Sequence, residues 1–483
     1  MKLNNKNLLK DKLYINGKWI DSEKKFQVEN PATNEIIASL PMGGKSETSK
    51  AIEAASSVFL EWKQKPAKFR SKILKKWFSL IETNTEDLAR IMTLEQGKSL
   101  TEAMGEIRYA NSYIEWFSEE AVRSYGDTIP SHRADTRILV QKEPIGVIAT
   151  ITPWNFPAAM MIRKVSAAFA AGCTVVSKPS ELTPLTALAL VQLGEEAGIP
   201  PGVWNLVFGD FESIGEELCT NPIVRKISFT GSTRTGILLS QKSASSVKKM
   251  SLELGGNAPF LVFEDANIEK AVEGALSAKF RNSGQTCVCV NRFYVHANVL
   301  DEFSNKLKIK IESLKVGNGL EEEIDQGPLI NPQAVEKVNS HIQDAIQKGA
   351  SLKTGGNRHR LGGNFFEPTL LTGIHSEMKI CKEETFGPVA AIQSFQTDSE
   401  ALQLANDTEY GLAAYLFTES VSRIWKFSEL LEYGMIGINE GIISSEQIPF
   451  GGIKFSGYGR EGSKYGMEEF LQTKYLCWGG LNH

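Results

Sequence analysis

The residue whose surroundings best suit covalent chemistry is Cys287. It follows the run Gly284-Gln285-Thr286, and a strand-like stretch, 291–295, comes after it. A cysteine that only packs usually lies among apolar neighbours, whereas small and hydrogen-bonding neighbours could leave the sulfur open to a substrate. The segment alone fits both an inert buried cysteine and a nucleophile.

Two other segments carry groups that could act on a reacting carbonyl. Glu253 lies among apolar residues in LELGGN (252–257), where partial burial would raise its pKa towards that of a general base. Asn155 lies between the two prolines of PWNFP (153–157) and could donate its amide to an oxyanion. The alternatives are a salt-bridged structural glutamate and an asparagine that caps the next helix.

Three further segments suit a nucleotide. In FTGST (229–233) a glycine turn joins a strand to a helix start, where backbone N–H groups and Ser232 could meet phosphate oxygens. In KPSE (178–181) Lys178 and Glu181 follow a strand and could hydrogen-bond ribose hydroxyls. In KEETFGP (382–388) one carboxylate beside a rigid turn could hold a second ribose. An ordinary capped turn and solvated charges are the alternatives.

Two other features could suggest binding sites, but neither supports one. Residues 457–462 match G-x-G-x-x-G, but they lie too near the end of the chain for a βαβ unit, so a glycine-rich loop before a helix is expected. The six histidines show no metal-ligand spacing, and no metal is expected.

The elements that must position these residues follow from periodicity. Apolar residues recur at helical spacing in 46–64 and 70–81, and short apolar strands alternate with helices from residue 146 onward. This alternation predicts parallel sheets in two α/β domains that meet near 255–256. The segments 127–143 and 473–478 read instead as exposed strands that could pair with another subunit.

Composition excludes several classes of protein. The 483 residues carry a net charge of −4, so no nucleic-acid surface is implied. No apolar run approaches the roughly 18–20 residues that span a bilayer, and the first residues lack a secretion signal. Six cysteines in so long a chain are no disulfide framework, which favours a cytoplasmic location.

Taken in order, the motifs PWNFP, KPSE, FTGST, LELGG, GQTC, EETFGP and PFGG (449–452) resemble the aldehyde dehydrogenase superfamily over nearly the whole chain. FRNSGQTCVCVNR and NEGIISSEQIPFGG are similar to its succinate-semialdehyde dehydrogenases. The resemblance implies an α/β fold with a Rossmann-like cofactor domain, an α/β catalytic domain and a small β oligomerisation arm. The expected division is 1–126 and 144–255 for the NAD(P)-binding domain, 256–450 for the catalytic domain, and 127–143 and 451–483 for the arm and C-terminal segment.

The resemblance also assigns roles to residues. Catalysis is expected from Cys287 as nucleophile, Glu253 as general base and Asn155 as oxyanion donor, together with the Cys287 amide. The expected cofactor-binding residues are Trp154, Lys178, Glu181, Gly231, Ser232, Glu384 and Phe386. The expected ligands of a substrate carboxylate are Arg163, Arg281 and Ser444, although Arg163 could instead be a surface helix residue.

The expected reaction is oxidation of succinate semialdehyde to succinate with reduction of NAD, NADP being possible, through a Cys287 thiohemiacetal and thioester. Another semialdehyde such as glutarate semialdehyde, or a broad range of aldehydes, is the first alternative. A cofactor-free thioester hydrolase and a non-catalytic binding protein are the others. A homodimer or homotetramer is expected, with no nucleic-acid or membrane partner, and a reversible disulfide between Cys287 and Cys289 stays open.

Overall fold

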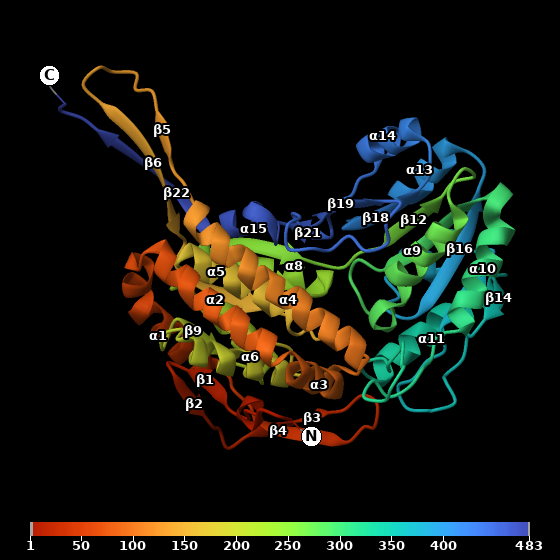
Figure 1. The fold of residues 1–483 in the computed structure, drawn as a ribbon, viewed down its shortest axis with the longest axis horizontal. Coiled ribbons are helices and arrows are strands. Elements are labelled where there is room, and N and C mark those ends of the chain that lie inside the picture. Colours follow the sequence, from red (N-terminus) through yellow and green to blue (C-terminus); the bar gives the residue numbers. More distant parts are fainter. Residues whose placement is uncertain (1–2, 482–483) are drawn as a thin grey trace.

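The computed structural model describes residues 3–481, and two separate sheets organise them (Figure 1). The first has the order β2-β1-β9-β8-β7-β10-β11-β21, and its strands from β9 to β11 are parallel. Its central strand β7 is buried at every position, because helices cover both faces of the sheet. The bounds are Lys18–Ile20 (β2), Leu13–Ile15 (β1), Trp204–Leu206 (β9), Thr174–Lys178 (β8), Val147–Ile151 (β7), Val224–Thr230 (β10), Lys249–Glu253 (β11) and Gly457–Tyr458 (β21).

The chain winds outward from β7 through β8 to β9, then returns to build β10 and β11 on the other side. The reversal lies between β7 and β10, and in open α/β sheets ligands bind beyond the carboxyl ends of strands at such a point. The helices of this lobe are α1 (Lys45–Gln64), α2 (Ala67–Thr83), α3 (Thr85–Gln96), α4 (Leu100–Glu120), α5 (Ala159–Ala171), α6 (Pro184–Ala197), α7 (Phe211–Thr220), α8 (Thr233–Ser243) and α15 (Ser463–Glu468).

The second sheet has the order β14-β15-β16-β13-β12-β18-β19 and forms the other lobe (Figure 1). Its strands are parallel except for β14, which pairs antiparallel with β15. The bounds are Ser351–Thr354 (β14), Thr369–Thr372 (β15), Val389–Phe395 (β16), Val290–His296 (β13), Ala258–Val262 (β12), Ala413–Phe417 (β18) and Met435–Ile438 (β19). Its helices are α9 (Ile268–Phe280), α10 (Leu300–Glu312), α11 (Pro332–Gln347), α12 (Lys379–Lys382), α13 (Asp398–Asn406) and α14 (Val421–Leu430).

A third sheet of three strands forms an arm that extends away from both lobes, at the upper left of Figure 1. It has the order β22-β6-β5, with β6 paired antiparallel to both neighbours. Its bounds are Leu471–Trp478 (β22), Arg137–Pro144 (β6) and Asp127–Ile129 (β5). Two short antiparallel pairs complete the strands: Lys25–Glu29 (β3) with Ile36–Pro41 (β4), and Tyr410–Gly411 (β17) with Ile453–Lys454 (β20).

The structure agrees with the helices and strands expected from periodicity, including the change of sheet after β11. The segment expected as one exposed strand is two, β5 and β6, because the chain turns between them. The G-x-G-x-x-G segment contributes strand β21 to the first sheet, where it pairs with β11, before α15 begins. In the part of the chain from 3 to 481, no helix combines the length and apolarity that crossing a membrane requires.

Candidate active site

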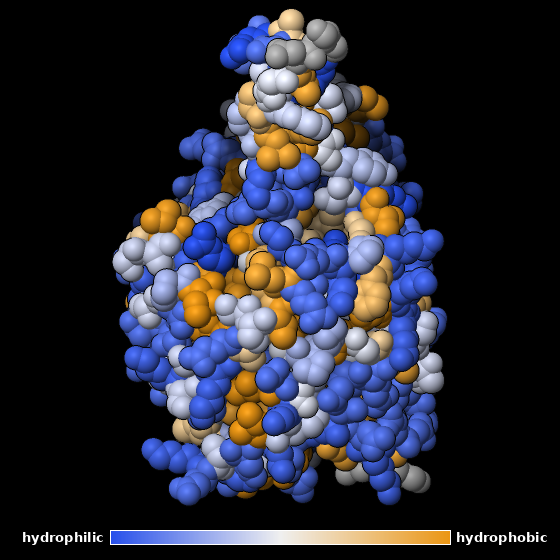
Figure 2. All heavy atoms as spheres, turned by 90° about the vertical axis from the view of Figure 1, so that its left-hand side faces the viewer, coloured by the Kyte–Doolittle hydropathy of each residue, from blue (hydrophilic) through white to orange (hydrophobic). Residues whose placement is uncertain are grey.

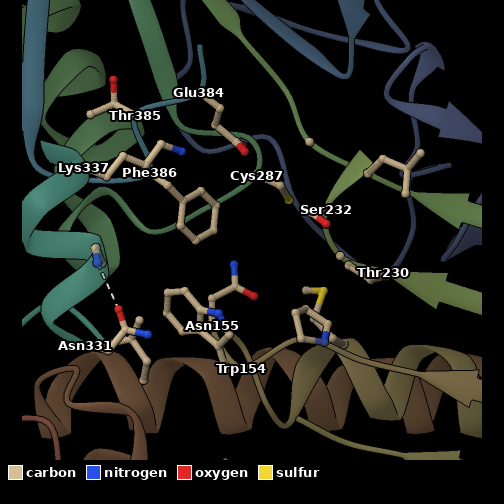
Figure 3. Close-up of a pocket in the computed structure, with 17 residues that line it drawn as sticks. Trp154, Asn155, Thr230, Ser232, Cys287, Asn331, Lys337, Glu384, Thr385 and Phe386 are labelled. Atoms are coloured by element: carbon tan, nitrogen blue, oxygen red, sulfur yellow. Dashed lines mark hydrogen bonds between the residues drawn. The ribbon is translucent and has the colours of Figure 1, made fainter. Parts of the chain in front are cut away.

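A cavity of about 300 Å³ opens between the two lobes, at the switch point of the first sheet (Figure 3). The loops after β7 and β10 form one wall, and Cys287, α11 and the turn at 384–386 form the other. The residues of the cavity that the sequence predicted are Trp154, Asn155, Gly231, Ser232, Cys287, Glu384 and Phe386.

The loop that delivers Cys287 has an unusual backbone. Asn282, Ser283 and Gly284 adopt consecutive left-handed conformations, with φ of 52°, 55° and 72°. A Cβ on Gly284 would lie 2.1 Å from the Gly387 carbonyl oxygen, so only glycine fits there. Glu102 of α4 holds the loop by accepting the Asn282 amide at 2.7 Å. Such strain persists only where the surroundings enforce it.

The Cys287 thiol lines the cavity and is half-buried. Burial raises the pKa of the Cys287 thiol to about 12, and the Arg163 guanidinium opposes the rise. Cys289 is buried and donates to the Lys279 carbonyl at 3.5 Å, and both cysteines are free thiols. Cys289 therefore occupies a core position in this structure.

Asn155 does not cap the next helix. Its Nδ2 donates to the Gln285 carbonyl at 3.0 Å, which leaves the second N–H of the amide without a partner among the described residues. The amides of Ala158, which precedes α5, and of Ala159, its first residue, donate instead to Glu106. In Figure 3 the Asn155 amide points into the cavity on the side of Cys287. One amide proton is thus available to an oxygen bound there.

Glu253 ends β11 and is 2% exposed, and none of the salt bridges in the described part of the chain includes it. Neither of its carboxylate oxygens has a hydrogen-bond partner within residues 3–481. Burial raises the pKa of Glu253 well above its usual range, and the nearby Glu461 carboxylate raises it further. A carboxyl group of this kind can take up a proton near neutral pH.

Arg163 is 1% exposed, so the alternative of a surface helix residue is wrong. It forms a buried ion pair with Glu461, which also pairs with Lys164, and its guanidinium lies 4.4 Å from the Phe450 ring centroid. Its two terminal nitrogens have no acceptor among the described residues.

The other two expected carboxylate ligands lie on separate segments. Arg281 begins the cysteine loop, half-buried, with its guanidinium 5.5 Å from the ring centroid of Phe156 and no ion pair in the described part of the chain. Ser444 lies in the half-buried loop after β19, where the Tyr113 hydroxyl donates to the next carbonyl, that of Ser445, at 3.2 Å. Arg163, Arg281 and Ser444 are not among the residues that line the 300 Å³ cavity.

The groups that could hold a dinucleotide form a continuous path. Ser232 caps α8 by accepting the Thr235 amide, and Gly231 before it has no room for a Cβ, which would lie 2.5 Å from the Phe229 ring. A second cavity of about 280 Å³ shares Ile330 and Asn331 with the first and reaches Glu181.

Two carboxylates mark positions along this path. Glu181 pairs with the buried Lys178 at the carboxyl end of β8, so these charges are not a solvated turn. Burial raises the pKa of Glu384 to about 7, and its Oε1 accepts the Gly256 amide at 3.3 Å. Two carboxylates along cavities that share residues, together with a capped helix start, provide groups that can bind the two riboses and the pyrophosphate of a pyridine dinucleotide.

Sequence reasoning missed several residues of the site. Lys337 of α11 lines the cavity and points towards Glu384 (Figure 3), and nothing in its surrounding sequence signals this. Glu461 lies inside the glycine motif at 457–462, where the only available signal was a pair of charged residues between two glycines. Lys98 and Glu106 read as ordinary solvated charges but are buried beneath the site, and nothing in the sequence signalled the half-buried Glu102 either.

A doubly wound sheet with a ligand cleft at its switch point, faced by a cysteine from a second α/β lobe, defines a two-lobed nucleotide-dependent enzyme. The chain belongs to the aldehyde dehydrogenase family, whose sequence model matches residues 19–476.

Three similar proteins span the full length of the chain or nearly so. It is 57% identical to the succinate semialdehyde dehydrogenase of Acinetobacter baylyi and 54% identical to the glutarate-semialdehyde dehydrogenase of Pseudomonas aeruginosa, each over 100% of both chains. It is 54% identical to the succinate-semialdehyde dehydrogenase [NADP(+)] of Escherichia coli, over 99% of this chain and 100% of that protein.

Solved structures agree in fold. The succinate-semialdehyde dehydrogenase of Burkholderia pseudomallei is 55% identical, with a TM-score of 0.99 over 99% of this chain and 100% of that one. A betaine aldehyde dehydrogenase of Staphylococcus aureus, solved in complex with NAD+, is 35% identical, with a TM-score of 0.95 over 98% of this chain and 96% of that one.

Proposed function

We propose that the chain oxidises succinate semialdehyde to succinate with reduction of NAD or NADP. The observation that carries this substrate is a pair of arginines. The terminal guanidinium nitrogens of buried Arg163, whose charge acts on the Cys287 thiol, have no acceptor among the described residues, and Arg281 begins the cysteine loop without an ion pair in that part of the chain. The arginine fork binds a carboxylate through bidentate, charge-assisted hydrogen bonds. The names of the relatives at 54–57% identity support an aldehyde that carries a terminal acid.

In this proposal the Cys287 thiol gives its proton to solvent water, and the thiolate sulfur bonds to the aldehyde carbon. The π electrons of the carbonyl pass to its oxygen, which becomes an oxyanion. Asn155 Nδ2–H and the Cys287 amide donate to that oxyanion, and one such donor contributes about 3–4 kcal/mol in other enzymes. Ser444 would complete the carboxylate site at the far end of the substrate.

The bound nicotinamide supplies the acceptor for the hydride that leaves the thiohemiacetal carbon. The acyl group then remains on Cys287 as a thioester. Glu253 takes a proton from the water that attacks this thioester, which releases the acid and frees the thiol.

The proposed cofactor contacts follow the path between the cavities. Ser232 and the α8 amides would meet the pyrophosphate, Lys178 and Glu181 the adenosine ribose, and Trp154, Glu384 and Phe386 the nicotinamide end. Glu181 would accept from a ribose 2′-hydroxyl and repel a 2′-phosphate, which favours NAD. Its ion pair with Lys178 offsets part of that repulsion, so NADP remains the second cofactor.

The test is a set of initial rates at 340 nm with succinate semialdehyde, glutarate semialdehyde and butanal, each with NAD and with NADP. Butanal matches the four carbons of succinate semialdehyde without its charge, so its kcat/KM should be lower by on the order of 10²–10³, as expected for two lost charge-assisted bonds. Equal values for butanal would contradict the carboxylate site, and Arg281→Gln should reduce the ratio between the two substrates.

Glutarate semialdehyde is the second candidate substrate, favoured by the name of the P. aeruginosa relative. It differs by one methylene, which active sites discriminate by only about 10–200-fold. If kcat/KM is higher for glutarate semialdehyde than for succinate semialdehyde, glutarate semialdehyde becomes the proposed substrate.

The division into domains accompanies this function as part of the proposal: residues 1–126 and 144–255 bind the cofactor, 256–450 catalyse, and 127–143 and 451–483 assemble subunits. In Figure 2 the arm stands at the top of the molecule with apolar residues among polar ones on its surface. Tyr475 and Trp478 are 58% and 63% exposed there, which supports a homodimer or homotetramer. Six free thiols support a reducing cytoplasm.

A further inference from the structure

A buried ion pair lies beneath the loop that carries Asn155. Lys98 follows α3, Glu106 lies in α4, and their side chains are each 1% exposed. The Lys98 Nζ and Glu106 Oε2 atoms are 2.5 Å apart. This pair belongs neither to the cavity lining nor to the residues assigned a chemical step above.

The two charges hold opposite ends of one short segment. Lys98 Nζ donates to the Asn155 carbonyl at 2.9 Å and lies 3.9 Å from the ring centroid of Phe156. Glu106 Oε1 accepts the Ala158 amide at 3.0 Å and the Ala159 amide at 3.2 Å, at the start of α5. The segment 155–159 is therefore fixed at both ends by a single ion pair.

A second contact ties the same carbonyl to the nucleophile loop. Asn282 Nδ2 donates to the Asn155 carbonyl at 3.0 Å, while Asn155 Nδ2 donates to the Gln285 carbonyl at 3.0 Å. The orientation of the Asn155 amide thus depends on where its backbone lies relative to the cysteine loop. Lys98 is the charged donor that sets that position.

An ion pair in this place costs free energy, because both charges are removed from water. Replacing such a pair by apolar residues is often neutral or stabilising, so its presence is not explained by stability alone. A displacement of about 1 Å in a catalytic group can cost on the order of a hundredfold in rate.

We infer that Lys98 and Glu106 are positioning residues that place the Asn155 amide for the oxyanion. This inference rests on the proposed function, because it requires that Asn155 donates to the oxyanion. If the inference is right, changing Lys98 and Glu106 lowers kcat when Asn155 is present and has little effect on kcat when its side chain has been removed.

The experiment is a double-mutant cycle. The first change is Lys98→Met with Glu106→Gln. It removes both charges together, shortens the lysine side chain by one atom, and retains an amide oxygen for the backbone amides at the start of α5. The second is Asn155→Ala, and kcat and KM for succinate semialdehyde are measured in all four proteins. Lys226→Met is the control, because it breaks another lysine–glutamate pair, between the buried Lys226 of β10 and the partly buried Glu469, and neither residue lines the cavity.

The paired change should lower kcat about 10–100-fold with KM changed less than about threefold, since the oxyanion forms only after binding. In the Asn155→Ala protein the same change should lower kcat by less than about twofold. Lys226→Met should lower the melting temperature and leave kcat unaltered.

Equal losses in both backgrounds, or a fall in melting temperature alone as for Lys226→Met, would overturn the inference. If Asn155→Ala itself leaves kcat unchanged, Asn155 has no oxyanion role, and both the proposed function and the inference fail on this point. That result differs from an equal loss in both backgrounds, which would overturn the inference alone. Should the paired change prevent folding, Lys98→Arg enters the same cycle, because it keeps the charge but replaces the point donor by a planar fork.

Discussion

Cys287 combines a position open to substrate with a thiol that is hard to ionise. Burial raises its pKa to about 12, so the thiolate fraction at neutral pH is small and grows about tenfold for each pH unit below that value. In the protein without cofactor, alkylation by iodoacetamide should therefore accelerate about tenfold per unit between pH 7 and pH 9. Mass spectrometry of the Cys287 peptide measures this rate, and a plateau below pH 8 would show that the thiol ionises more easily than its burial indicates.

Glu253 is the other buried group whose protonation matters. An amide of the same shape cannot take up the proton of the attacking water, so Glu253→Gln should reduce kcat by on the order of 10²–10⁴. Formation of the thioester precedes that step, so stopped-flow absorbance at 340 nm should still show one equivalent of reduced cofactor per site in a burst. A variant with unchanged steady-state turnover would remove Glu253 from the role of base.

The Glu181 carboxylate should determine how strongly the protein prefers NAD over NADP. Replacing its carboxylate by the amide in Glu181→Gln removes the like charge facing a 2′-phosphate and frees Lys178 from its ion pair. The ratio of kcat/KM for NADP to that for NAD should rise by about tenfold or more. A ratio that stays constant would place cofactor selection elsewhere in the second cavity.

At the scale of elements, the cysteine loop depends on backbone conformations that few side chains tolerate. Gly284→Ala would put a methyl group 2.1 Å from the Gly387 carbonyl oxygen, so we expect a loss of about 3 kcal/mol or more in the free energy of unfolding and loss of activity. Gly105→Ala is the control, because no atom lies within 4 Å of its new methyl group on α4. That variant should be as stable as the parent or more so. Urea unfolding compares the two, and similar free energies would contradict the argument.

Only part of the conformation of this loop could be predicted from the sequence. The run GQTC predicted a tight turn before Cys287, since glycine and polar residues are its local cause. The left-handed conformations of Asn282 and Ser283 have a distant cause, because Glu102 accepts the Asn282 amide from a helix 180 positions earlier in the chain. The residues next to Asn282 in sequence do not indicate a hydrogen-bond partner in a distant helix.

For the molecule as a whole, the alternation of strands and helices sufficed to predict two largely parallel sheets. The arm segments were predicted because they departed from that alternation and had the pattern of exposed strands. Neither pattern could predict which charges the fold would bury. Glu106 and Glu461 look like solvated charges in sequence, yet one is held by Lys98 and the other by Arg163 and Lys164. Buried charges become recognisable only with their partners, and those partners come from elements far apart in the chain.

In our proposal the arm forms the contact between subunits of the oligomer. Among residues 3–481, its edge strands β22 and β5 each pair on one side only. Tyr475 and Trp478 of β22 expose apolar surface that another subunit would cover. The double change Tyr475→Glu and Trp478→Glu should therefore lower the mass measured by light scattering after gel filtration, by half or more. Trp425→Glu is the control, since this tryptophan of α14 is 66% exposed on the other lobe and the same chemical change there should leave the mass unaltered. Because the arm extends away from the cavity, kcat per subunit should fall much less than the mass. An unaltered mass in the arm variant would exclude this edge as the contact between subunits.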